Sequence, residues 1–157
     1  TSMAGNITAK YGSANSAITV TLTSLTTANS RASTAIDNTS NLYTDALVQV
    51  QVRTTTGASS TGYTNVYAYG TSATTYPGGI SGTDGAYSGA VSNLTLIGRI
   101  PTAAVNTTYT SNVLSVAGAF GGSLPSSWGI VVENQSSSTF DGSVGSAWYQ
   151  GVQAQYT

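Results

Sequence analysis

The 157-residue chain contains no cysteine and no histidine. Without either residue, it cannot form the Ser-His-Asp or Cys-His systems that activate a nucleophile. The usual zinc sites, and the usual ligands of haem and iron–sulfur clusters, are excluded for the same reason. A chain without cysteine is typical of a protein that is made in a reducing cytoplasm and is stable without disulfides.

Charge is also scarce, because charged residues make up 6% of the chain and the formal net charge is −1. An ordinary globular domain has roughly a quarter of its residues charged. Four lysines and arginines are too few for a basic nucleic-acid footprint, so we expect no nucleic-acid partner. No apolar run approaches the roughly 18 residues of a membrane span, so we expect no membrane partner.

Hydroxyl residues are abundant instead, with 26 threonines and 23 serines. A neutral surface rich in hydroxyl groups gives little long-range steering and little self-repulsion. Natural sheets often protect their edges with charge, and this chain has little to use. Such a surface suits a protein that is held permanently in an assembly, or one that is exposed outside a cell.

Apolar and polar residues alternate with a period of two, and no heptads or long helical periodicity occur. The alternation predicts strands within six segments: 18–23, 48–53, 65–69, 94–100, 128–132 and 152–156. In the fourth segment, it places Leu94, Leu96 and Ile100 on one face. Strands separated by turn signals indicate an antiparallel sandwich or barrel.

The segments between these strands are rich in Thr, Ser and Gly. Residues 54–62, 71–89 and 135–145 are therefore predicted loops. Residues 27–41 are predicted to form a long connection with an extended piece near Ala35 and Ile36, and residues 114–120 a strand or a short helical turn. The length favours one domain over residues 1–157, and the polar segment 1–11 is a candidate N-terminal arm that reaches a neighbour.

Five carboxylates are candidates for catalysis: Asp37, Asp45, Asp84, Glu133 and Asp141. Two that faced each other could hydrolyse a glycosidic bond, but nothing in the sequence brings two together. Most lie beside a turn signal or at a strand end, where Asp normally caps or turns the chain. We therefore predict no catalytic residue and no enzymatic activity.

Oxygen ligands are concentrated in the segment Asp37-Asn38-Thr39-Ser40-Asn41. A hard cation such as calcium could bind such a segment, but its spacing matches no calcium loop, and an Asx-turn is the favoured interpretation. The Gly118-Ala119-Phe120-Gly121-Gly122 stretch has no following lysine or helix, so it predicts a tight turn rather than a phosphate loop. No metal and no cofactor is expected. The five Asn-x-Ser/Thr triplets are attributed to composition.

Aromatic residues are the most suggestive group in the sequence. Five tyrosines fall in one region rich in loops: Tyr63, Tyr67, Tyr69, Tyr76 and Tyr87. If exposed, they could stack on sugar rings or anchor a protein interface. Alternatively, Tyr67 and Tyr69 pack a sheet face. Trp128 and Trp148 lie beside apolar strand patterns and are predicted to be in the core.

Two stretches are the most distinctive in the chain, Phe120-Gly121-Gly122-Ser123-Leu124-Pro125 running into Trp128-Gly129, and Trp148-Tyr149-Gln150-Gly151. Together with segments 21–25, 46–52, 66–70, 96–98 and 130–134, they resemble a small structural protein encoded by many tailed bacteriophages. The resemblance extends over most of the chain, in the same order.

The resemblance implies a virion component, a capsid decoration (cement) protein that bridges neighbouring major capsid proteins on the outside of the head. Such proteins are commonly β-rich, often jelly-roll and often trimeric. We therefore expect an all-β, jelly-roll-like antiparallel sandwich of about eight strands. The expected partners are a major capsid protein and two sister copies in a homotrimer, with the protein made in the host cytoplasm and located on the head surface.

The motifs identify no binding residue. A glycan-binding module of a phage tail or fibre is the alternative, because of the tyrosine-rich region and the neutral surface.

Overall fold

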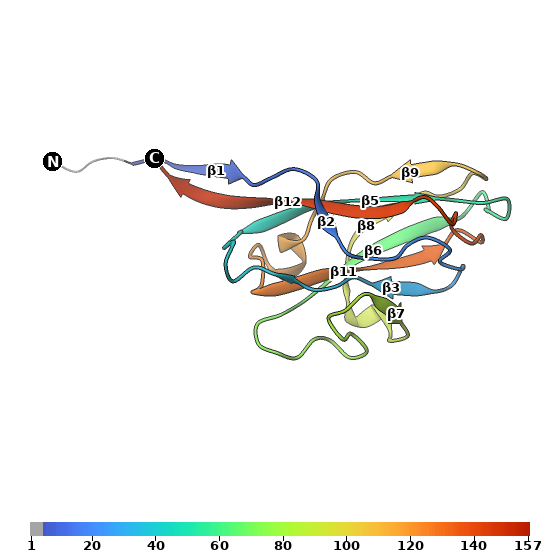
Figure 1. Cartoon of the computed structure of the whole chain (residues 1–157), viewed down its shortest axis with the longest axis horizontal. Helices are drawn as coiled ribbons and strands as arrows, with labels where there is room; N and C mark the ends of the chain where they lie inside the picture. The colour runs from blue at the N-terminus through green and yellow to red at the C-terminus, as the bar shows by residue number, and fades with distance from the viewer. Residues whose placement is uncertain (1–4) are drawn as a thin grey trace.

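Two antiparallel sheets face each other in the structure, a computed structural model that describes residues 5–157 (Figure 1). The first sheet contains β1 (Ile7–Tyr11), β2 (Ser16–Ile18), β5 (Asp45–Arg53), β9 (Thr108–Thr110), β10 (Leu114–Ser115) and β12 (Gly145–Tyr156). The second contains β3 (Ser30–Ala32), β4 (Ile36–Asp37), β6 (Tyr63–Thr71), β7 (Gly85–Tyr87), β8 (Thr95–Ile100) and β11 (Ser127–Gln135). Two 3₁₀-helices, η1 (Val91–Asn93) and η2 (Ala117–Phe120), lie in the connections. The predicted all-β sandwich is confirmed.

The strands pair as they do in a jelly roll. Early strands pair with late ones: β2 with β12, β3 and β4 with β11, β5 with β9 and β10, and β6 with β8. In a jelly roll, these pairs form one long hairpin that rolls up, so that strands from different pairs become neighbours. Here β12 lies beside β5 in one sheet, and β11 lies beside β6 in the other. These pairs define eight strand positions. The other strands, β1 and β7, extend the sheet edges.

The main core lies between the two sheets. Strand β5 alternates strictly, burying Ala46 and each second residue up to Val52 while the residues between them face outward. Across the sandwich, Trp128 of β11 is 1% exposed and meets the Tyr149 ring of β12 edge-on, with 5.2 Å between the ring centroids. Val and Ile fill most of the remaining space, as the pleated inner faces of two sheets require.

A second, smaller core covers the outer face of the second sheet. Tyr67, Tyr69 and Val131 project from that face, and Tyr87 and the segment 76–94 pack over them. Strands β6 and β11 are consequently buried on both faces. The predicted loop 71–89 is therefore a cover for the sheet, and it contains β7, which the sequence analysis missed.

The remaining strand predictions are partly confirmed. Five segments lie within or overlap β5, β6, β8, β11 and β12, but the segment 18–23 is strand only at Ile18, although Val20 and Leu22 are buried as the alternation predicts. The predicted connection 27–41 includes β3 and β4, and residues 114–120 contain both a short strand and a helical turn.

The prediction that Leu94, Leu96 and Ile100 share one face of the strand at β8 is wrong. Tyr67 pairs with Leu96 but Val66 pairs with Gly98, so Ile97 is an extra residue in a β-bulge. The bulge reverses the alternation, so Ile97 and Ile100 pack against the main core and Leu96 is left 46% exposed. A period-two pattern cannot reveal such an insertion.

Strand β1 and the end of β12 form a two-stranded ribbon that extends beyond the body of the sandwich (Figure 1). Strand β5 pairs with β12 only as far as Val152, so residues 153–156 have β1 as their neighbour in the sheet. The proposed N-terminal arm thus includes β1, and residues 1–4 of it lie outside the described part of the chain.

Candidate interaction surface

The five carboxylates do not gather at one place in the structure. Each accepts hydrogen bonds within its own turn or from a neighbouring segment. Asp84 accepts a hydrogen bond from Arg31 Nε at 2.7 Å and further bonds from the Thr21 amide and hydroxyl. Burial raises the pKa of Asp84, but the hydrogen bonds from Arg31 and Thr21 outweigh it, and the pKa lies below its usual value. Asp84 therefore ties β3 to the segment before β7.

Asp37 and Asp45 each accept backbone hydrogen bonds near a chain reversal. Asp37 accepts from the Thr39 amide at 2.8 Å, the predicted Asx-turn, and this bond lowers the pKa of Asp37. Asp45 accepts from the Ser115 hydroxyl and the Ala117 amide, so it holds β10 and the start of η2.

Glu133 is 7% exposed and lies on the outer face of the second sheet. Its carboxylate accepts hydrogen bonds from the Asn65 amide and the Tyr67 hydroxyl, and Asn65 in turn accepts from Arg99 Nε at 2.8 Å. Among residues 5–157, no three acidic side chains gather where they could hold a metal ion. The candidate acids thus have distinct structural contacts, and no pair of them hydrogen-bonds to a shared group.

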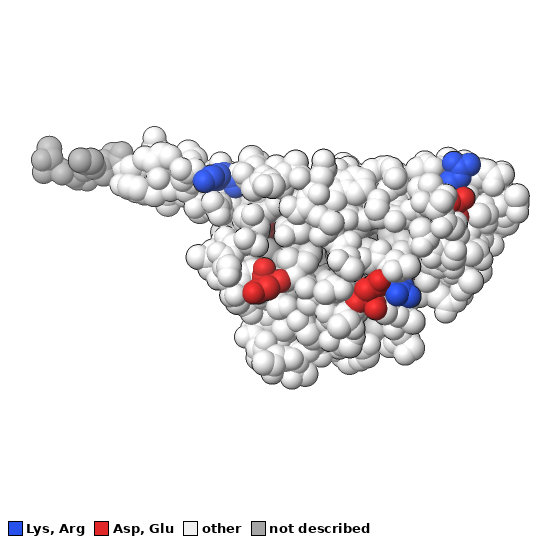
Figure 2. Space-filling view, in the orientation of Figure 1, with Lys and Arg blue, Asp and Glu red and all other residues white. Residues whose placement is uncertain are grey.

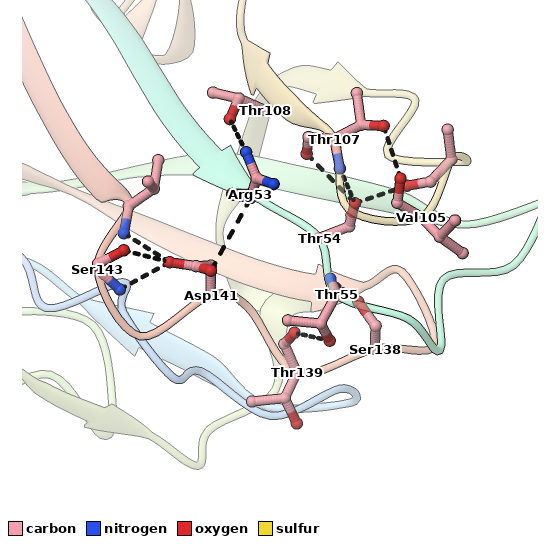
Figure 3. Close-up of polar contacts among 12 residues, drawn as sticks. Arg53, Thr54, Thr55, Val105, Thr107, Thr108, Ser138, Thr139, Asp141 and Ser143 are labelled. Carbon is pink, nitrogen blue, oxygen red and sulfur yellow. Dashed lines mark hydrogen bonds and ion pairs between the residues drawn. The ribbon is translucent and has the colours of Figure 1, made fainter.

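The fifth carboxylate, Asp141, belongs to a network of hydroxyl groups at one end of the sandwich (Figure 3). It accepts hydrogen bonds from the Ser143 hydroxyl and amide, which lower its pKa, and lies 3.9 Å from Arg53 Nε. Beside it, the buried Thr54 hydroxyl bonds to the segment 104–107, and the Thr55 hydroxyl donates to Thr139. Hydroxyl groups and one carboxylate therefore satisfy the loop backbone at this end of the sandwich.

The five tyrosines of the loop-rich region are mostly covered by other residues, whereas stacking on a sugar ring requires an exposed aromatic face. Tyr67, Tyr69 and Tyr87 are buried, and their hydroxyls bond to Glu133, Ser33 and Ala90. Tyr76 packs edge-on against Tyr69, and the Arg99 guanidinium lies 4.1 Å above the Tyr63 ring. Packing on a sheet face is therefore the correct interpretation for Tyr67 and Tyr69.

The prediction that Trp148 lies in the core is wrong. Its neighbours Ala147 and Tyr149 point into the main core, so Trp148 projects from the outer face of the first sheet, the side away from the second sheet. Two hollows flank its indole. The first, about 420 Å³, is lined by Asn15, Ala17 and Ser146, and the second, about 240 Å³, by residues that include Leu47, Gln49, Val113 and Gln150.

The ribbon has two unlike faces. Directly opposite residues of an antiparallel pair project to the same side, so one face carries three apolar pairs: Ile7 with Tyr156, Ala9 with Ala154, and Tyr11 with Val152. The other face carries Thr8 with Gln155 and Lys10 with Gln153. Ile7 is 77% exposed and Tyr156 is 69% exposed. We call the first side the apolar ribbon face.

The apolar ribbon face continues the outer face of the first sheet. Alternation along β12 puts Tyr156, Ala154 and Val152 on the same side as Trp148. None of the residues on the apolar ribbon face or lining the two hollows is charged. Figure 2 shows that charged side chains are few on the face in view, and that some of them lie beside a charge of opposite sign, as in the pairs Arg31–Asp84 and Arg53–Asp141. This outer face is the candidate interaction surface.

The two distinctive stretches of the sequence have structural roles. Gly121 ends η2 with a φ of +75°, a conformation that favours glycine. A Cβ at Gly151 would collide with the Tyr43 ring, which covers β12 where the ribbon begins. The stretches thus shape the turn before β11 and the base of the ribbon.

No protein-family model and no curated protein matches this sequence. In the described part of the chain, the helices are too short to cross a membrane.

Proposed function

We propose that this protein is a virion structural protein, a capsid decoration (cement) protein that binds the outside of a phage head and stabilises the shell. The observation that carries the proposal is the apolar ribbon face, which projects from the jelly roll with Ile7 and Tyr156 largely exposed. An isolated two-stranded ribbon is marginally stable in water, so it gains stability from packing against another protein.

Three further observations support the proposal. The stretches that resemble phage structural proteins are distributed along the chain between residues 21 and 151. The carboxylates hold turns and strands together, as described above. The neutral surface favours permanent short-range contact over long-range attraction.

The mechanism is passive. Each bound copy buries surface against assembled shell subunits and not against loose ones. Binding to one state only shifts the equilibrium towards that state by mass action, so the shell is stabilised in proportion to the free concentration and affinity of the protein. Repetition over many sites then resists the internal pressure of the packaged genome.

The test uses DNA-filled heads that lack the protein, to which the purified protein is added in increasing amounts. We expect the temperature of DNA release to rise and then level off when the sites are filled. Heads that already carry the full complement are the control and should show no further rise. An unchanged release temperature, with no protein sedimenting with the heads, would contradict the proposal.

A glycan-binding module is the second candidate, and Trp148 is the observation that favours it. A partly exposed indole between two hollows could stack on a sugar ring. However, the amide groups of Gln49 and Gln150 already donate to the Ser111 and Gly12 carbonyls. A glycan array with the parent protein and Trp148→Ala separates the two candidates, because a silent parent protein removes this one.

A further inference from the structure

Glu133 is a buried carboxylate that forms no ion pair with any of the described residues 5–157. Its two oxygens accept hydrogen bonds from the Asn65 amide at 3.4 Å and from the Tyr67 hydroxyl at 3.3 Å. Both are longer than ordinary hydrogen bonds, which measure roughly 2.5–3.2 Å. All four lysines and arginines of the chain are described, and none of them pairs with Glu133. A buried carboxylate is costly unless a cation or further donors compensate it.

The register of the second sheet places Glu133 in a row of polar side chains on the outer face. Directly opposite residues of antiparallel strands project to the same side. The row consists of Ser30 (β3), Glu133 (β11), Asn65 (β6) and Arg99 (β8). Burial and the negative charge of Glu133 raise the pKa of Tyr67, so its phenol stays protonated as a donor. The carboxylate is thus held from the Asn65 side of the row.

A hollow of about 340 Å³ lies over the other side of the row, where Glu133 and Ser30 belong to its lining. We call it the Glu133 hollow. Its remaining polar side chains come from Asn29, Ser88 and Gln135, besides the Tyr87 hydroxyl, which donates to the Ala90 carbonyl. Among the described residues that line it, Glu133 alone is charged. A space of this volume is sufficient for a small organic molecule.

The chemistry of the lining favours one class of ligand. Calcium takes about six to eight oxygen ligands, usually with more than one carboxylate, and the hollow supplies one carboxylate. A sugar ring stacks on an exposed aromatic face, but Tyr87, the aromatic residue of the lining, is 5% exposed. An ammonium group supplies both things that Glu133 lacks, a positive charge and hydrogen-bond donors at short distance.

We propose that the Glu133 hollow binds the ammonium group of a small organic amine. The ammonium donates to the Glu133 carboxylate from the Ser30 side, and the side chains of Ser88 and Gln135 offer it further acceptor oxygens. The hydrocarbon part of the ligand contacts Val91, the bulkiest aliphatic residue of the lining. The inference goes beyond the proposed function and does not depend on it, because the hollow lies on the second sheet and the apolar ribbon face belongs to the first.

The first experiment titrates the purified protein with propylamine hydrochloride at neutral pH and low salt, and follows the backbone amides by ¹⁵N NMR. We expect saturable shifts centred on Ser88 and Gln135. Glu133→Gln keeps the shape of the side chain but removes its charge, so it should weaken binding by about 10-fold or more, the factor expected for a hydrogen bond to a charged group. Asp37→Asn removes a carboxylate from an exposed turn outside the hollow and is the matched control, which should leave binding unchanged.

A second variant keeps the inference testable if Glu133→Gln does not fold. Gln135 lies two residues from Glu133 on the same face of β11 and also lines the hollow. Gln135→Lys therefore places an ammonium of the chain itself beside Glu133, and we expect it to weaken propylammonium binding by about 10-fold or more. Gln155→Lys adds the same charge to the ribbon, away from the hollow, and should leave binding unchanged.

Each outcome decides the inference. Saturable shifts at the hollow that the folded variants lose, and the two controls keep, support it. Shifts that 1-propanol reproduces at the same concentrations, or that either folded variant leaves unchanged, overturn it. Calcium chloride that displaces propylammonium from these amides at lower concentration would identify a metal site and would also overturn it. The titration uses the isolated protein, so its result is separate from that of the head-binding test of the proposed function.

Discussion

At the scale of single residues, buried hydroxyl groups donate hydrogen bonds to backbone carbonyls in this protein. Tyr69 is an example, because its hydroxyl donates to the Ser33 carbonyl at 2.7 Å beneath the cover of the second sheet. Burial raises the pKa of Tyr69 from 10.0 to about 12, despite that hydrogen bond. The neutral phenol is therefore the form that the folded state prefers.

This preference predicts a loss of stability in alkali. The folded-state pKa of Tyr69 is higher than the unfolded one, so its contribution is full below pH 10.0 and is lost as the pH rises towards about 12. Tyr69→Phe should cost about 1 kcal/mol at neutral pH through the lost hydrogen bond. The variant should then lose less stability than the parent between these pH values in urea titrations; equal losses would contradict the prediction.

The lowered pKa of Asp84 predicts that stability depends on pH in the opposite direction, in the acid range. Its folded-state pKa is below 3.8, so its contribution to stability is present above that pH and is lost as the pH falls through the folded-state value. Asp84→Asn should lower the melting temperature at neutral pH and weaken its dependence on pH in the acid range. Arg31→Gln, which removes the partner of the ion pair, should do the same. Acid melting curves of both variants that parallel those of the parent would show that the pair contributes nothing.

At the scale of strands, two residues with similar neighbours in the sequence can point to opposite faces of a sheet. Trp128 and Trp148 both lie beside apolar residues in a strand, but one faces the core and the other faces outward. The bulge at Ile97 has a similar effect, because it moves Leu96 out of the core. Side-chain direction thus depends on register, which a partner strand imposes.

The two tryptophans should therefore differ in their effect on folding. Trp128→Ala removes a fully buried indole and should cost about 3–5 kcal/mol of the free energy of unfolding. Trp148→Ala should cost the isolated chain about 1 kcal/mol or less, because its side chain lies on an outer face. Urea unfolding at low protein concentration, where copies are separate, gives both values. A larger loss for Trp148 would place it in the core after all.

At the scale of the whole molecule, the scarcity of charge predicts behaviour towards salt. Contacts between charged surfaces weaken as ions screen them, and contacts between neutral apolar surfaces do not. The dissociation constant of the proposed binding to heads should change less than about 3-fold between roughly 0.05 and 0.5 M sodium chloride. A change of more than 10-fold would mean that Lys10 or the exposed carboxylates take part in that contact.

Much of the architecture follows from local pattern. Alternation along β5 reports which face of the strand is buried, because successive side chains of a strand point to opposite sides. The abundance of turn residues between the strands then indicates an antiparallel sandwich. The Asx-turn at Asp37 could be predicted for a similar reason, since it depends on residues within two positions of each other.

Features that depend on distant partners could not be predicted in this way. The cover of the second sheet, the bulge in β8 and the outward direction of Trp148 each arise from pairing or packing between residues far apart in the chain. The apolar ribbon face is the clearest case, because alternation places Val152, Ala154 and Tyr156 together but cannot show that β5 has ended. Composition thus accounts for a neutral all-β chain, and long-range pairing accounts for the apolar surface that the chain leaves uncovered.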